Sequence, residues 1–189
     1  MLSQSRILNH PNHFNIEGNT MDIIKYAMQM ELDGKTFYEN GAKKASAPMI
    51  RKVFETLAVE EHRHYHFFKN MKENKKQDVE KAASIKKDAV KMVKNVFMEM
   101  VDSGKNQIAG DSTKAIWEEA LLIEQKAEKL YRDAAEKEAD KNKKKLLNII
   151  ADEEKSHIYL IDNMLSFLKD PETFAASQNY QSFMSWEGR

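Results

Sequence analysis

Six glutamate and histidine side chains recur in this sequence as two copies of one pattern, and their spacing could hold metal ions. In each copy a glutamate precedes a Glu-x-x-His motif by thirty residues; the residues are Glu31, Glu61 and His64, then Glu124, Glu154 and His157. The offset is constant, because 124 − 31, 154 − 61 and 157 − 64 all equal 93. Glu-x-x-His places a carboxylate and an imidazole on one helix face. Two such motifs and two further inward glutamates form the ligand set of a dinuclear site in a four-helix bundle.

The six positions share a second property, which is that each falls on the apolar stripe of its segment. Folding would therefore bury four carboxylates together, at a high cost unless cations compensate them. Two divalent ions would bring four positive charges to the four glutamates. Carboxylate oxygen and imidazole nitrogen suit iron or manganese, and no sulfur ligand favours copper(I). We therefore expect two metal ions per chain.

Four other residues obey the same offset and could support the ligands. Tyr38 and Tyr131 lie two helical turns after the first glutamate of each copy, so each is either a hydrogen-bond donor to a ligand carboxylate or a core aromatic. Glu60 and Glu153 directly precede the Glu-x-x-His motifs. Each is either exposed or accepts a hydrogen bond from the outer N–H of the opposite histidine.

Small residues and unmatched histidines complete the set of candidates. Gly34 and Ala127 are offset partners one turn after a ligand glutamate, where small side chains would leave space for an oxidant or allow close helix packing. His62 and His66 flank the first motif histidine but have no histidine counterpart in the second copy. We expect both at the surface or at an interface.

Long helices must position these residues, and the apolar spacing predicts four of them, over about 21–44, 48–74, 112–138 and 141–168. The connection over 75–112 contains a further helical stripe formed by Val90, Val93, Phe97, Met100 and Val101. The predicted fold is all-α: two helical hairpins joined by one long crossover with a short helix, the wiring of a ferritin-like bundle. We expect an arm over 1–20, the bundle over 21–168, and an aromatic tail over 169–189 that packs on the bundle or on a second subunit.

Composition narrows the classes of function. The chain has 189 residues, with 30 basic and 30 acidic side chains, so no charge bias points to nucleic acid or to an anionic membrane. The absence of cysteine excludes a thiolate-held metal and fits a reducing cytoplasm. No apolar run suggests a membrane span or a signal peptide. The aromatic tail and the apolar crossover helix favour a homodimer.

Four segments resemble the helices of the rubrerythrin branch of the ferritin-like superfamily: MQMELDGKTFY, LAVEEHRHYHFF, LLIEQKAEKLY and IADEEKSHIYLI. The resemblance implies a diiron site in which Glu61 and Glu154 bridge the irons, and the other four residues are terminal ligands. It also implies reduction of hydrogen peroxide, or oxidation of ferrous iron by dioxygen or peroxide.

The sequence departs from that family in two places. Rubrerythrins proper carry another glutamate three residues after the third-helix ligand, where this chain has Ala127. They also carry a rubredoxin domain, whose four cysteines are absent here. Electrons must therefore come from ferrous iron or from a separate donor such as a rubredoxin.

Three classes of function follow from these observations. The first is a diiron oxidoreductase that reduces peroxide or dioxygen. The second is an iron-storage or iron-handling subunit, which predicts a large hollow oligomer. The third is a helical scaffold that retains the carboxylates without metal.

Overall fold

The computed structural model describes residues 20–73, 75, 91, 93–99, 101–102 and 112–186, and every regular element among them is helical. Four long helices dominate: α2 (Thr20–Lys44), α3 (Pro48–Lys72), α5 (Lys114–Lys137) and α6 (Lys141–Lys169). Two shorter helices follow, α7 (Pro171–Ala175) and α8 (Gln178–Ser185). The predicted bounds of the long helices are confirmed to within about two residues.

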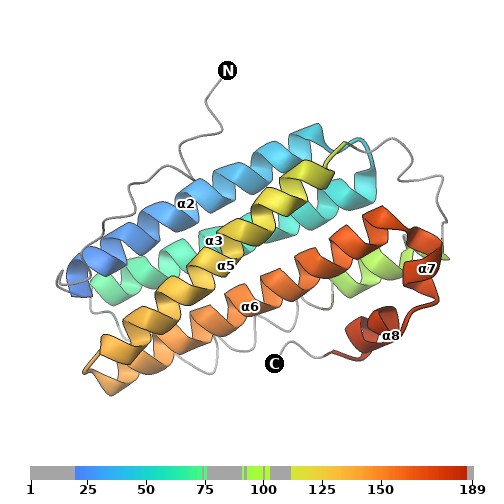
Figure 1. The fold of residues 1–189 in the computed structure, drawn as a ribbon. Coiled ribbons are helices and arrows are strands. Elements are labelled where there is room, and N and C mark those ends of the chain that lie inside the picture. Colours follow the sequence, from blue (N-terminus) through green and yellow to red (C-terminus); the bar gives the residue numbers. More distant parts are fainter. Residues whose placement is uncertain are drawn as a thin grey trace.

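The long helices form two antiparallel pairs, α2 with α3 and α5 with α6 (Figure 1). Further contacts join α2 to α5 and α3 to α6, so the two pairs close into one bundle. The second helix of each pair begins with a residue suited to a helix N-terminus. Pro48 is the first residue of α3. The carboxylate of Asp140 caps α6 by accepting hydrogen bonds from the amides of Asn142 and Lys143.

The crossover between the pairs contains a helical segment among the described residues 91, 93–99 and 101–102. Val93 and Phe97 are buried there, as the apolar stripe predicted, and Val96 is buried beside them. Val90 and Met100 of that stripe lie outside the described residues, as does the arm over 1–19 with His10 and His13. The predicted all-helical wiring of hairpin, crossover and hairpin is confirmed. The domain boundaries stay predictions.

The core consists of two apolar clusters with the six candidate ligands between them along the bundle. On α2, Ile24 and Ala27 belong to one cluster and Tyr38 and Ala42 to the other, with Glu31 between. In α3, α5 and α6 the candidate ligands likewise lie between residues of the two clusters, and the direction of each helix decides which cluster comes first in the sequence. The glutamates and histidines therefore form a single ionisable layer midway along a largely apolar interior.

The C-terminal segment packs on the bundle, which is one of the two placements expected for it. Phe174 of α7 and Phe183 of α8 are buried against Phe97 of the crossover, with ring centroids 6.1 Å and 4.8 Å away. Pro171 follows the end of α6 and begins α7, whose N-terminus is capped by Asp170. None of the described helices carries a stretch apolar enough to span a bilayer.

Candidate metal centre

All six predicted ligands lie in the interior, one from each of α2 and α5 and two from each of α3 and α6. Their exposed fractions run from 0% to 7%. This burial follows from helix geometry, because each residue occupies the inward stripe of an amphipathic helix. The two histidine rings face each other nearly in parallel, with centroids 5.6 Å apart.

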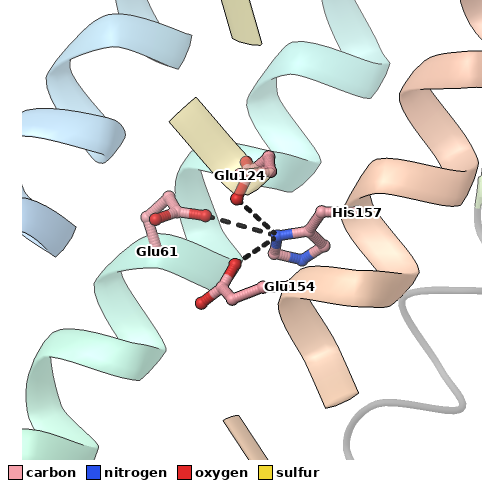
Figure 2. A group of neighbouring side chains, drawn as sticks. All are labelled: Glu61, Glu124, Glu154 and His157. Carbon is pink, nitrogen blue, oxygen red and sulfur yellow. Dashed lines mark ion pairs between the residues drawn. The ribbon is translucent and has the colours of Figure 1, made fainter. Parts of the chain in front are cut away.

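One group of side chains surrounds the inner nitrogen of His157. Its Nδ1 lies 3.4 Å from Oε1 of Glu61, 3.7 Å from Oε2 of Glu124 and 3.2 Å from Oε2 of Glu154. Figure 2 shows these groups converging from α3, α5 and α6. One ligand atom from each of the four residues fits within a 4.8 Å span, which is compatible with a single bound ion.

A second group surrounds the inner nitrogen of His64. Its Nδ1 lies 3.0 Å from Oε1 of Glu154 and 3.5 Å from Oε2 of Glu31. Glu154 belongs to both groups, one oxygen facing each histidine. The arrangement thus contains two adjacent groups that share one carboxylate, and each of them could hold an ion.

Two tyrosine hydroxyls hold the terminal glutamates from across the bundle. Tyr38 of α2 donates to Oε1 of Glu124 on α5, and Tyr131 of α5 donates to Oε1 of Glu31 on α2. The two bonds are related by the 93-residue offset. Both tyrosines are fully buried, so they are core aromatics and hydrogen-bond donors at the same time.

The outer side of His64 is closed by a charged network. Nε2 of His64 lies 2.7 Å from Oε2 of Glu153, and Nη2 of Arg63 lies 2.6 Å from the same oxygen. Nη2 of Arg63 also donates to Oε2 of Glu60 at 2.5 Å. Because an ionised carboxylate can only accept, Nε2 of His64 donates to Glu153, and the neutral imidazole that a metal ion requires would keep its proton on Nε2 and direct the lone pair of Nδ1 inward.

The opposite histidine lacks this network. Glu60 would reach His157 if the two copies were equivalent, but it binds Arg63, and no described residue accepts from Nε2 of His157. The side chain of His157 is 8% exposed, against 0% for His64. Neither alternative given for Glu60 is therefore correct: it is buried, and it binds Arg63 instead of the opposite histidine.

Sequence reasoning missed Arg63, although the repeat contains a signal for it. The offset partner of Arg63 is Ser156, because 63 + 93 = 156. The second copy therefore has no arginine beside its motif histidine, and the two halves of the layer differ on this side.

Burial and mutual repulsion shift the pKa values of the glutamates. Desolvation, and then the charges of Glu124, Glu31 and Glu154, raise the pKa of Glu61 well above its usual value. Burial raises the pKa of Glu154 to about 7, against the opposing effect of His64. Excess negative charge is therefore costly in this layer, and a cation or a proton relieves it.

The pKa values of the two histidines are raised, and the pKa of Glu153, the outer partner of His64, is lowered. Burial lowers the pKa of His64, but Glu154 and Glu153 outweigh it and raise that pKa well above the usual value. The pKa of His157 is raised in the same way by Glu124, despite its burial. Burial raises the pKa of Glu153, and the hydrogen bond from His64 more than reverses this, so Glu153 is an ionised acceptor.

The donor atoms fit a pair of divalent cations. Several inward atoms are buried without a hydrogen-bond partner, which is a costly arrangement for groups of this kind; they are Oε1 of Glu61, Nδ1 of His64, both carboxylate oxygens of Glu154 and Nδ1 of His157. All are natural ligands of iron or manganese. The four glutamates balance the charge of two divalent ions, so the layer would be neutral when filled.

Of the remaining candidates, the two small residues are buried and the two unmatched histidines are exposed. Gly34 is buried, and a Cβ added to it would lie 2.8 Å from Oε2 of Glu61, so only glycine leaves that carboxylate in place. Ala127 is buried as well. His62 and His66 are exposed, as expected.

Comparison with known proteins identifies the family. The family model described as Rubrerythrin matches residues 22–165, which include the four long helices almost completely and all six candidate ligands. No curated protein and no solved structure matches the chain. Since the matched region covers most of the 189 residues, the chain belongs to the rubrerythrin family.

Proposed function

We propose that this protein is a non-haem diiron oxidoreductase that reduces hydrogen peroxide or dioxygen. The observation that carries the proposal is the layer of carboxylates and imidazoles, several of whose atoms lack a hydrogen-bond partner, buried at the centre of a rubrerythrin-family bundle. A pair of ferrous ions bound there would supply the two electrons that reduction of one hydrogen peroxide to two waters consumes.

The protein's part in this reaction is to hold two ions and keep their ligands in place. Glu31, His64 and Glu154 would hold one ion, and the residues of Figure 2 would hold the other. Glu154 would bridge the two positions; the resemblance adds Glu61 as a second bridge. The tyrosine hydroxyls orient the terminal glutamates and limit their rotation.

Electrons must reach this chain from outside, because it contains no cysteine that could hold a second redox iron. A separate rubredoxin or ferrous iron itself would serve as the donor. We further propose that the chain works as a homodimer.

Single-turnover kinetics tests the proposal. Protein loaded anaerobically with ferrous iron is mixed with hydrogen peroxide or with dioxygen, and oxidation is followed by absorbance. Peroxide as the faster oxidant supports a peroxide reductase, and dioxygen as the faster oxidant supports a ferroxidase. Glu154→Ala is the matched variant, because it removes the carboxylate common to both groups. Oxidation by neither reagent, or equal rates in the variant, would refute the assignment.

An iron-handling role is the second candidate, and Ala127 favours it. The family's peroxide reductases carry a glutamate at this place, whereas here the buried side chain is a methyl group. Iron storage requires a hollow assembly of many subunits, so light scattering decides between the two. A dimer would exclude storage.

A further inference from the structure

Two histidines on the outer face of α3 lie side by side and have no part in the buried layer. Nε2 of His62 and Nε2 of His66 are 3.2 Å apart, and the ring centroids are 4.5 Å apart. His64, two residues from each, is rotated by about 200° on the helix and points into the core. The HRHYH stretch therefore directs one histidine inward and two outward.

The separation of the two nitrogens matches two ligands of one ion. Imidazole nitrogens bind zinc at about 2.0–2.1 Å. Two such nitrogens are then about 2.8–3.4 Å apart for angles between 90° and the tetrahedral value. Histidines four residues apart on one helix face are a recurring metal-binding pair. An exposed hydrogen bond between two neutral rings, by contrast, gains little over bonds to water.

The ring of His62 also lines a groove between α2 and α3. The groove encloses about 730 Å³, and its other charged lining residues are Lys35, Glu39, Lys43, Arg51 and Glu55. Lys35 and Glu39 both interact electrostatically with His62, Lys35 the more strongly, and Oε1 of Glu39 is 2.5 Å from Nζ of Lys35. The groove leaves this side of His62 open to an ion and its water ligands, with this lysine–glutamate pair in electrostatic reach.

We propose that His62 and His66 form a third metal site, which binds one transition-metal dication such as zinc, nickel or copper(II). Imidazole suits these ions, and copper(II) binds most tightly among them. The second copy of the repeat lacks this pair, because the offset places Lys155 and Tyr159 at the corresponding positions. It is independent of the buried dinuclear centre and of the reaction proposed there.

Copper(II) binding to the purified full chain tests this site. Equilibrium dialysis gives the number of bound ions, and electron paramagnetic resonance gives the nitrogen couplings. His62→Ala and His66→Ala should each bind one tight copper fewer than the wild type. The affinity of that ion should fall at least about tenfold, since even the loss of a ligand's supporting partner costs that much. Both substitutions are at exposed positions, so circular dichroism should stay unchanged.

Two control variants separate this site from other copper ligands in the chain. The double variant His10→Ala/His13→Ala removes the histidines of the N-terminal arm and should keep the ion. Glu154→Ala disrupts the buried layer and should also keep it. The proposal is overturned if His62→Ala and His66→Ala bind as much copper as the wild type. It is equally overturned if only the arm variant loses the ion.

Discussion

Arg63 makes the two halves of the buried layer different, and replacing it should weaken one metal position selectively. Its Nη2 holds Glu60 and Glu153 together, and Glu153 in turn orients His64. In Arg63→Met two carboxylates would face each other without a cation between them. One would take up a proton or turn away, and His64 would lose its fixed acceptor.

The expected magnitude follows from the burial of these groups. Breaking a fully buried ion pair costs about 3–5 kcal/mol. The side chain of Arg63 is 21% exposed, so water offsets part of the loss and we expect about 2–3 kcal/mol of unfolding free energy. Loss of a ligand's outer partner lowers metal affinity about 10–100-fold. This corresponds to about 1.4–2.7 kcal/mol.

Anaerobic titration with ferrous iron or cobalt(II) measures the two stepwise affinities. In Arg63→Met the affinity of the position that contains His64 should fall 10–100-fold. The affinity of the position that contains His157 should change little. Arg132→Met is the matched control, because Arg132 joins α5 to α6 through Asp152, 2.5 Å away, without contacting a ligand. Equal losses at both positions, or no loss at either, would refute the reasoning.

Three further predictions concern the same layer. Tyr131→Phe removes the hydrogen bond to Glu31 and should cost about 0.5–1.5 kcal/mol in urea denaturation; an unchanged midpoint would contradict the role given to the hydroxyl. Gly34→Ala brings a methyl group against Glu61 and should reduce bound iron below two per chain, whereas full occupancy would contradict the displacement of a ligand carboxylate by this methyl group. In chelator-treated protein the raised pKa of Glu154, about 7, means that the folded state holds its proton more tightly than the unfolded state. The stabilisation that this bound proton gives is complete below about pH 4.5 and is lost as pH rises through 7. The urea midpoint of the chelator-treated protein should therefore fall over that range, whereas that of the metal-loaded protein should not.

The sequence could predict the fold and the position of the layer because both depend on periodicity. The offset of 93 residues places equivalent side chains on equivalent helix faces, and the amphipathic stripes determine which face is buried. The hydrogen bonds of Tyr38 and Tyr131 follow from the same geometry, since each lies two turns beyond a glutamate of its own helix and meets one on the neighbouring helix.

Contacts that break the repeat could not be predicted in this way. Glu60 was expected to mirror Glu153, but its partner is chosen by a long arginine side chain that reaches between α3 and α6. Helical periodicity does not predict which residues a long side chain contacts on another helix. The helices α7 and α8 were also not predicted, because their short sequences gain helical structure mainly by packing Phe174 and Phe183 onto the crossover.

Metal content per chain tests the central claim most directly. The protein is loaded anaerobically with ferrous iron, freed of excess metal and measured by elemental analysis, beside the Glu154→Ala variant. The dinuclear layer predicts two iron ions per wild-type chain and fewer in the variant, which loses the carboxylate shared by both groups. No bound iron in the wild type, or equal amounts in both proteins, would contradict the account.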